Sequence, residues 1–307
     1  MKIALFDGDR KFTVDLIEHW KQCGHEVKID KSWDPALVNW CDVAFFEFCE
    51  NSIMRASDLN DHFYKDPTCG QQPMDKIIIC REHDIDAWVG NHGRVNWGWV
   101  NHLVFVADHI KDKVLSEIKL TPKTNVHLIK HGVNTNKFTF REKERSKKIA
   151  WIGTFKDHKR IETALMILAE LPRDYSLHIM GRGLRDWRKL YVDYFIKQNN
   201  LNVVFDNVGW VSNINDWLQD KDFLLSCSTK EAFGFAIAEA CSVGIKPIIH
   251  NFPFANQIWN PEWIWNTVSE AKQLILEDKY ESLKYRQYVE QNYPLDKMLK
   301  QYNELLK

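Results

Sequence analysis

Short apolar runs alternate along this chain with amphipathic stretches. A run such as Val43–Phe48 is long enough for a buried strand, whereas the residues between Phe12 and Trp20 space their apolar positions as a helix does. Strands that are separated by helices predict parallel βαβ units, and therefore an α/β fold. The predicted strands are Lys2–Asp7, His25–Ile29, Val43–Phe48, Lys76–Cys80, Leu103–Ala107, Val126–Lys130, Lys148–Gly153, Leu177–Met180, Val203–Val208, Phe223–Cys227 and Pro247–Ile249.

The alternation of predicted strands and helices forms two series, which are separated by one charged run. At 307 residues the chain is long enough for two domains of ordinary size. The charged run Arg141–Lys148 lies between two apolar segments and is typical of a solvated linker. We therefore predict one α/β domain at residues 1–140 and a second at residues 147–292. Helical patterns dominate the remainder, and the last of them covers Leu295–Leu306.

Composition limits the classes of function. Apolar residues make up 45% of the chain and the formal net charge is −1, so no basic excess favours DNA or RNA as a partner. The seven cysteines form no C-x-x-C pair, which is typical of reduced thiols in a cytosolic protein. No apolar stretch is long enough for a membrane span, and the N-terminal apolar run is too short for a signal peptide. We expect a cytoplasmic protein whose membrane contact is at most peripheral.

The most informative stretch is Lys230–His250. It predicts a loop, a short helix of small residues and a buried strand, and a loop followed by a helix N-terminus can receive an anion. Gly234 lets the backbone approach a ligand closely. Glu231 and Glu239 are separated by seven residues. If the chain is helical from Ala232 onward, Glu239 lies roughly 12 Å further along, at 1.5 Å per helical residue. Hydrolytic glycosidases hold their carboxyls about 5–9.5 Å apart, so this spacing favours the two ends of one long ligand, such as a nucleotide-sugar.

This stretch resembles the donor site of a known enzyme family. It reads E-x7-E with F-G inside, followed by E-A-x-x-x-G-x-x-P, and it is similar to the motif of family-4 glycosyltransferases, retaining enzymes of the GT-B fold. The sequence G-H-E-V at Gly24–Val27 and the turn H-G-V-N-T-N-K-F at His131–Phe138 also resemble that family. The resemblance covers most of the chain and is strongest from Lys148 to His250.

The resemblance implies a fold and a reaction. The fold is two Rossmann-like domains facing across a cleft, with a C-terminal helix, here residues 293–307, crossing back to the N-terminal domain. The N-terminal domain then lies on the acceptor side and the C-terminal domain binds the nucleotide-sugar. The implied reaction moves a hexose from a UDP- or GDP-sugar to a saccharide or lipid-linked saccharide with retention of configuration. No metal and no cofactor is implied, because the nucleotide-sugar is a co-substrate.

Three residues receive catalytic roles from the resemblance. Glu231 holds the sugar hydroxyls and orients the anomeric carbon. Lys159 matches the lysine of the family pattern G-R-x-x-x-x-K, and a lysine beside a glycine turn at the mouth of a helix can neutralise a diphosphate. His83 follows the strand Lys76–Cys80, and a histidine at the carboxyl end of a strand is a candidate acid, base or oxygen-binding group. The resemblance places it against the sugar.

Further residues are expected to bind the donor. Glu239 would bind the ribose hydroxyls, and Thr154 stands where the family has its arginine. The full predicted donor-binding set is Gly8, Thr154, Lys159, Gly181, Val211, Phe233, Gly234, Phe235 and Glu239.

Several alternatives stay open. Asp84-Ile85-Asp86 and Asp7-Gly8-Asp9 could each be the metal-binding D-x-D of GT-A glycosyltransferases, although that reading leaves Glu231 and Glu239 without a role. The acceptor could be a modified base in DNA. The missing arginine at Thr154 also allows a sugar-nucleotide-binding protein without catalysis. Epimerisation of a nucleotide-sugar, on the same fold, is a further possibility.

Overall fold

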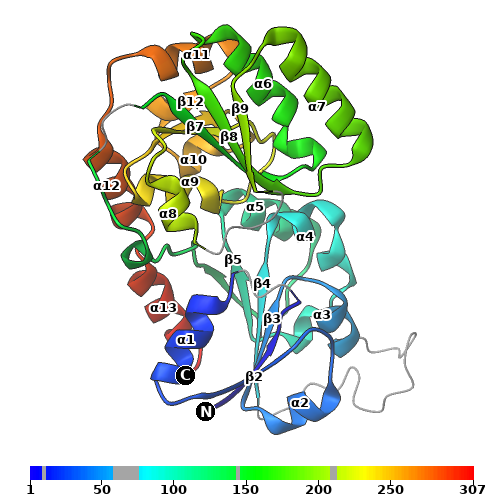
Figure 1. Cartoon of the computed structure of the whole chain (residues 1–307). Coiled ribbons are helices and arrows are strands. Elements are labelled where there is room, and N and C mark those ends of the chain that lie inside the picture. Colours follow the sequence, from blue (N-terminus) through cyan, green and yellow to red (C-terminus); the bar gives the residue numbers. More distant parts are fainter. Residues whose placement is uncertain (9–11, 58–75, 143–145, 208–212) are drawn as a thin grey trace. The chain divides into compact units, whose positions relative to one another are not determined.

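The computed structural model describes residues 1–8, 12–57, 76–142, 146–207 and 213–307. These residues form two compact units (Figure 1). The N-terminal unit consists of Met1–Gly132 together with Leu295–Lys307, and the C-terminal unit is Val133–Pro294.

The N-terminal unit contains a parallel sheet with the strand order β2-β1-β3-β4-β5-β6. Its strands are β1 Lys2–Phe6, β2 Glu26–Asp30, β3 Val43–Glu47, β4 Ile77–Glu82, β5 His102–Phe105 and β6 Asn125–Leu128. Its helices are α1 Val14–Gln22, α2 Pro35–Trp40, α3 Asn51–Ala56, α4 Asp84–Val89, α5 Asp108–Glu117 and α13 Leu295–Glu304, with 3₁₀ turns η1 Asn91–Arg94 and η2 Trp97–Trp99.

Burial along these strands follows their place in the sheet. All five residues of β3, a central strand, are buried, whereas β2 at the edge contains no fully buried residue. Parallel sheets that are covered on both faces require such continuous apolar runs at their centre. The apolar run at Val43 therefore predicts an interior strand from the sequence alone.

The C-terminal unit contains a second parallel sheet with the order β12-β11-β10-β7-β8-β9. Its strands are β7 Lys148–Thr154, β8 Ser176–Arg182, β9 Val203–Asn207, β10 Phe223–Ser226, β11 Lys246–His250 and β12 Ile264–Trp265. Its helices are α6 Ile161–Glu170, α7 Asp186–Asn199, α8 Ile214–Leu218, α9 Phe235–Ser242, α10 Ala255–Ile258, α11 Val268–Leu276 and α12 Ser282–Asn292, with 3₁₀ turns η3 Thr135–Lys137, η4 Asp157–Lys159 and η5 Pro261–Trp263.

Two apolar cores lie on the two faces of this second sheet. Ile149 and Trp151 of β7 belong to one core, and Ala150 between them belongs to the other. The same alternation occurs in β11, where Ile248 and Ile249 point to opposite cores. Successive side chains of a strand point to opposite faces, so a strand of continuous apolar residues supplies both layers at once.

The C-terminal helix α13 belongs to the N-terminal unit. Met298 and Tyr302 are buried in the same core as Leu16 and Trp20 of α1. Asn303 contacts His19 at 2.7 Å between Nδ2 and Nε2, and the two helices lie side by side in Figure 1. The predicted return of the last helix to the first domain is confirmed.

The predicted α/β class with two Rossmann-like domains is confirmed as well, but the boundary differs from the predicted linker. The division falls between Gly132 and Val133, ahead of the predicted end of the first domain at residue 140. Val133 bridges to Pro294, and Phe138 packs against the core of the C-terminal unit. The charge pattern of Arg141–Lys148 cannot reveal such packing. Three of the residues in that run, 143–145, lie outside the described residues.

Short helices are the elements that the pattern missed. The helices α2, α3 and α4 have six residues each. Six residues contain fewer than two turns, too few for a helical period to emerge. Among the described residues no helix combines the length and the apolar character needed to cross a membrane.

Candidate active site

An ion pair in the C-terminal unit joins two residues that are 72 positions apart in the sequence. Lys159 ends η4 and donates from Nζ to Oε1 of Glu231, in the loop after β10. The side chains are 21% and 16% exposed, so the pair is enclosed but remains accessible to solvent. Two of the three predicted catalytic residues are therefore in direct contact.

Two glycines shape the floor beneath Lys159. Gly153 near the end of β7 pairs in register with Gly181 of β8. A Cβ atom on Gly181 would lie 2.1 Å from the carbonyl oxygen of Gly153, which no side chain allows. A Cβ on Gly153 would lie 3.5 Å from Cγ and Cδ of Lys159, so the lysine stem runs across this glycine at van der Waals distance. The predicted donor residue Gly181 is required here for close packing of the two strands.

The turn that follows Glu231 leads directly into a helix N-terminus. Gly234 precedes α9 with φ of 90°, in the left-handed region that glycine tolerates and other residues avoid. Among the described residues no side-chain hydrogen bond caps the helix at this position. The first N–H groups of a helix have no intrahelical partner, and the helix dipole is positive at this end. The geometry therefore provides a site for an anionic ligand three residues beyond Glu231.

Neighbouring contacts hold both loops in place. Trp259 Nε1 donates to the carbonyl oxygen of Phe233 at 3.0 Å, which fixes the turn before α9. The backbone N–H of Thr229 donates to the carbonyl oxygen of His158 at 2.9 Å and so links the Glu231 loop to the Lys159 loop. Arg188 of α7 forms an ion pair with Asp157 at the start of η4. These contacts, which lie outside the ion pair itself, hold the loops of Lys159 and Glu231 in position.

His158 lies directly before Lys159 and is partly buried. Burial lowers the pKa of its imidazole below the ordinary value, and the Lys159 ammonium lowers it further, while Glu231 acts in the opposite direction. The lowered pKa favours a neutral imidazole beside the Lys159 ammonium.

A second polar cluster occupies the carboxyl ends of β3 and β4 in the N-terminal unit. Glu47 accepts hydrogen bonds from Arg81 Nε at 2.7 Å, from Arg81 Nη2 at 2.8 Å and from His83 Nε2 at 2.8 Å. Arg81 also donates to Tyr302 Oη and to the carbonyl oxygen of Phe12. Burial alone would raise the pKa of Glu47, but Arg81 and His83 outweigh it and the pKa is lowered. Glu47 is therefore an anion with saturated oxygens.

His83 lies where the sequence placed it, at the carboxyl end of β4, and is 2% exposed. Its ring centroid lies 4.3 Å from that of Phe48 and 5.0 Å from that of Phe12. It forms a capping box with Asp86 at the start of α4. The contacts of His83 are thus to Glu47, to aromatic rings and to a helix start, and its predicted contact with a sugar stays a prediction.

The other predicted donor residues occupy different environments. Gly8 is exposed after β1 of the N-terminal unit, and Thr154 is partly buried at the end of β7. Phe233 is 5% exposed and packs against Trp259 and Tyr293, so its side chain belongs to the apolar core.

The remaining members of the predicted set belong to α9 or to an undescribed loop. Phe235 begins α9, and Glu239 is partly exposed on the same helix. Val211 lies outside the described residues.

The D-x-D alternative does not fit this structure. Asp84 and Asp86 both belong to the first turn of α4, where positions two apart do not face each other. Asp86 is 1% exposed, and its Oδ2 accepts from the backbone N–H of His83. The two carboxylates therefore cannot chelate one ion together. In the other triplet Asp7 is buried and bound by Thr13, and Asp9 lies outside the described residues.

Sequence reasoning missed the Glu47–Arg81 pair. Each residue ends or nearly ends an apolar run, and the two are partners in the β3–β4 register. A charge at the carboxyl end of an otherwise apolar strand was the available signal.

A family of known proteins matches half of this chain. The family is described as glycosyl transferases group 1, and the match covers residues 133–286. No curated protein is similar enough in sequence to be counted as a relative.

Solved structures resemble the whole chain at low identity. Sucrose-phosphate synthase from Thermosynechococcus elongatus is 14% identical with a TM-score of 0.75, over 99% of this chain and 98% of that one. Anabaena HepE in complex with UDP is 12% identical with a TM-score of 0.72, over 99% and 98%. The lipopolysaccharide outer core galactosyltransferase WaaB is 16% identical with a TM-score of 0.69, over 100% and 99%. At these identities the likeness concerns the fold alone.

A longer protein also matches. S. aureus TarM, solved with fondaparinux, α-GlcNAc-glycerol and UDP, is 14% identical with a TM-score of 0.65. The alignment covers 86% of the present chain but 55% of TarM, so this chain spans about half the length of that protein.

Proposed function

This chain belongs to the glycosyl transferases group 1 family and has the GT-B fold, and on that premise we propose that it is a retaining hexosyltransferase. The donor would be a UDP- or GDP-sugar and the acceptor a saccharide or lipid-linked saccharide. The observation that carries the proposal is the accessible Lys159–Glu231 pair beside the uncapped N-terminus of α9. That arrangement joins a cation, a helix N-terminus and a carboxylate, which match a diphosphate and a sugar.

The diphosphate would be held by Lys159 and α9. An ammonium group has three N–H donors, so Lys159 can keep its bond to Glu231 and still bind a phosphate oxygen. The N–H groups at the start of α9 supply a second, fixed source of positive charge. Stabilisation of charge that develops on a leaving group is usually the largest catalytic contribution. In this proposal these groups of the chain, and no metal ion, stabilise the departing nucleoside diphosphate.

Glu231 would bind the sugar. A carboxylate accepts hydrogen bonds from two hydroxyls at once, and Lys159 engages only one of its oxygens, Oε1, in the described contacts. Binding of the hydroxyls would orient the anomeric carbon toward the diphosphate. Glu239, further along α9, would accept from the ribose hydroxyls.

The bond changes balance without a covalent enzyme intermediate. The bond between the anomeric carbon and the diphosphate oxygen breaks, and the nucleoside diphosphate leaves with the bonding electrons. The acceptor oxygen forms its bond to the anomeric carbon from the same face. The acceptor proton passes to the leaving diphosphate oxygen, and the anomeric configuration is retained.

Arg182 is a candidate for the cation that the family carries at Thr154. In the β7–β8 register Thr154 pairs with Arg182, and residues paired directly across two strands point to the same face. Arg182 is exposed, which suits contact with a phosphate. We expect Arg182→Ala to weaken donor binding. Arg185→Ala, three residues on and also exposed, is the matched control.

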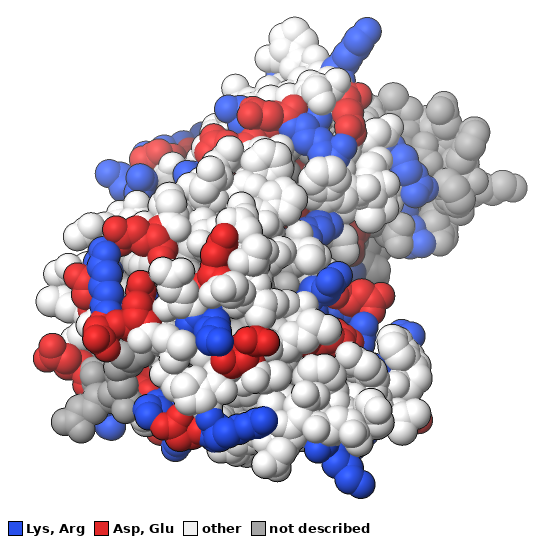
Figure 2. Space-filling view, turned by 90° about the horizontal axis from the view of Figure 1, so that it is seen from above, with Lys and Arg blue, Asp and Glu red and all other residues white. Residues whose placement is uncertain are grey.

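The acceptor is proposed from chemistry and from neighbours. HepE was solved with UDP and glucose, and TarM with UDP and α-GlcNAc-glycerol, which supports a saccharide acceptor for the present chain. A DNA acceptor has less support. On the face shown in Figure 2, cationic and anionic side chains are interspersed, and the net charge is −1. Binding to phosphate backbones needs an excess of positive charge.

The first experiment is a thermal-shift panel of UDP-, GDP-, ADP- and CMP-sugars on the full chain. A donor at one hundred times its Kd should stabilise the protein by about 2.7 kcal/mol. The stabilising donor is then tested for transfer, with the product anomer assigned by NMR. Turnover of the donor removes the non-catalytic alternative, whereas a new sugar formed without any acceptor indicates epimerisation.

The decisive variant is Glu231→Gln. It keeps the shape of the side chain and removes its charge, and we expect strong loss of transfer. Glu170→Gln, at an exposed glutamate of α6, is the control and should transfer at the normal rate. Full activity of Glu231→Gln, or a product of inverted configuration, would refute the proposal. Salt-sensitive binding of DNA would instead favour the DNA acceptor.

A further inference from the structure

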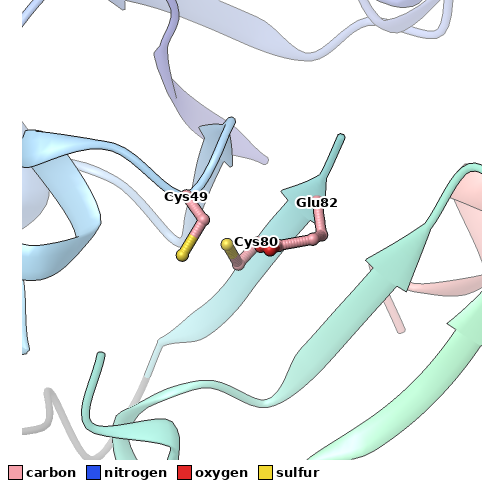
Figure 3. A group of neighbouring side chains, drawn as sticks. All are labelled: Cys49, Cys80 and Glu82. Carbon is pink, nitrogen blue, oxygen red and sulfur yellow. The ribbon is translucent and has the colours of Figure 1, made fainter. Parts of the chain in front are cut away.

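A buried group of two thiols and a carboxylate lies in the N-terminal unit. Cys80 and Glu82 are two residues apart on β4 and therefore share one face of the strand. Cys49 lies just beyond β3. One ligand atom of each residue lies within 4.8 Å of the others, and all three residues are buried. Figure 3 shows the side chains of Cys49 and Cys80 pointing toward each other and that of Glu82 directed toward Cys80.

The environment of the Glu82 carboxylate indicates that this group of side chains binds a cation. The residue is 0% exposed, and neither carboxylate oxygen has a hydrogen-bond partner among the described residues. Arg81, the adjacent cation, is engaged by Glu47. The charged neighbour of Glu82 is His92, whose Nδ1 lies 3.4 Å from Oε1. A buried carboxylate is unfavourable unless cations or donors surround it, and a coordinated metal ion would stabilise Glu82 together with the two adjacent thiols.

The backbone directs Cys49 toward β4. Phe48, immediately before it, has φ of 72°, a left-handed conformation that is rare for a bulky residue. Its N–H donates to the carbonyl oxygen of Arg81 at 3.0 Å, so the turn is anchored to β4. The turn therefore brings a thiol from one strand end to a thiol and a carboxylate on the next strand.

His92 lies next to the carboxylate. Its Nε2 is 2.8 Å from Glu117 Oε2 and its Nδ1 is 3.4 Å from Glu82 Oε1. A carboxylate only accepts, so Nε2 donates to Glu117. Glu82, and then Glu117, raise the pKa of the His92 imidazole. A bound metal ion would take the place of the proton on Nδ1, which lies 3.4 Å from Glu82. That separation is close to the roughly 3.3 Å between two tetrahedral ligands of one zinc ion. A carboxylate on the far nitrogen is also the usual partner of a metal-binding histidine.

We propose that Cys49, Cys80 and Glu82 bind a zinc ion, or another thiophilic divalent cation, inside the N-terminal unit. Two thiolates and a carboxylate are a zinc-type ligand set, and His92 is the nearest candidate for the fourth position. The ion stabilises this unit by neutralising Glu82 and joining the ends of β3 and β4. It takes no part in the proposed transfer reaction, whose diphosphate site lies in the C-terminal unit.

The test begins with the full chain in a Cys23→Ser background. Cys23 is exposed, and its Sγ lies 3.6 Å from His19 Nε2, so this surface pair could bind metal adventitiously. The reduced protein is stripped with a chelator and titrated with Zn²⁺ and, separately, with Co²⁺. We expect one equivalent of metal per chain, a raised unfolding midpoint with Zn²⁺, and thiolate-to-cobalt charge-transfer absorption with Co²⁺.

Matched variants locate the site. Glu82→Gln keeps the shape of the side chain and should weaken Zn²⁺ binding by more than the roughly 10–100-fold that loss of an outer partner causes. The double variant Cys49→Ser/Cys80→Ser should lose the cobalt absorption. Cys41→Ser is the control, because Cys41 is buried in the same unit but donates to the carbonyl oxygen of Val38. It should bind metal normally.

Three outcomes overturn the proposal. The reduced protein binds no stoichiometric metal, the cobalt absorption persists in the double variant, or the protein contains a Cys49–Cys80 disulfide and no metal when purified under reducing conditions. The first of these is decided on the unmutated cluster, so it does not depend on the folding of any variant. Donor binding is measured separately, which keeps a failure of the metal site distinct from a failure of the proposed transferase activity.

Discussion

Glu47 and Glu231 are two glutamates, one in each unit, that each bind a cationic side chain from another element. Glu47 has a side chain that is 1% exposed and accepts three hydrogen bonds from Arg81 and His83. Glu231 is 16% exposed and pairs with Lys159 through one oxygen. We call the Glu47 pair closed, because it is buried and both carboxylate oxygens accept hydrogen bonds. We call the Glu231 pair open, because it is partly exposed and uses one carboxylate oxygen.

The difference separates a structural ion pair from a binding site. A fully buried pair gains little net stability but is costly to break, because the remaining charge has no water. A partly exposed pair contributes little to stability, and its spare donors and acceptors can bind a ligand. Changes at Arg81 should therefore act on folding, and changes at Lys159 on function.

The largest expected effect is on the closed pair. Arg81→Met leaves Glu47 buried without its cation and should lower the free energy of unfolding by about 3–5 kcal/mol. Urea unfolding measures the loss, and hydrogen exchange assigns it to the N-terminal unit. The double variant Glu47→Leu/Arg81→Met should recover much of the loss, since an apolar pair needs no charge compensation. A single variant as stable as the wild type would contradict the comparison.

The open pair should respond in the opposite way. Lys159→Met should lower kcat/KM by about 10²–10³-fold, the loss that follows removal of one donor to a developing anion. It should change the free energy of unfolding by only about 0–1 kcal/mol. Lys272→Met, at a partly exposed lysine of the same unit, provides the baseline for both measurements. A destabilisation as large as that of Arg81→Met would show that the Lys159 pair is structural after all.

The two strands beneath Lys159 can be disturbed without changing the charges of the Lys159–Glu231 pair. Gly181→Ala places a Cβ atom against the carbonyl oxygen of Gly153 and forces β7 and β8 apart, at about 1–3 kcal/mol of stability. Because the stem of Lys159 runs across Gly153, donor affinity should fall as well. Gly93→Ala is the control, since no atom of the described residues lies within 4 Å of a Cβ there. Equal stability of the two variants would contradict the predicted clash.

The smallest effect should come from pH. Burial and then Lys159 lower the pKa of His158, with further contributions from Glu231 in the opposite direction and from Lys156 and Lys230. The unfolded chain then binds the proton first, so stability falls as pH decreases from about 6.5 toward the folded pKa. Above about pH 6.5 the stability contribution of His158 is level. His158→Gln should reduce this fall in thermal melts across that range. An unchanged slope would rule out His158 as its source.

Much of the fold could be predicted because it depends on local pattern. Continuous apolar runs predicted the central strands, and amphipathic spacing predicted the longer helices α1 and α13. Six-residue helices such as α4 were missed because the period is too short to detect. The division at Gly132 was missed because it depends on how Phe138 packs.

The site could be predicted only in part. The motif around Gly234 identified the turn, and the spacing after Gly153 identified Lys159. The same reasoning counted Phe233 as a donor residue, although its side chain packs in the core. It found neither Glu47 nor the thiols beside Glu82, because a residue type does not reveal which groups will surround it.

By itself the sequence determined that this is an α/β protein of two parallel sheets, with a glycine turn and helix N-terminus suited to an anion. Those features depend on residues that are close together in the chain. Only the tertiary structure decided the partners. Lys159 and Glu231 lie 72 residues apart and Glu47 and Arg81 lie 34 apart. Whether such a pair is buried and saturated or open to a ligand depends on the strands and loops that pack around it.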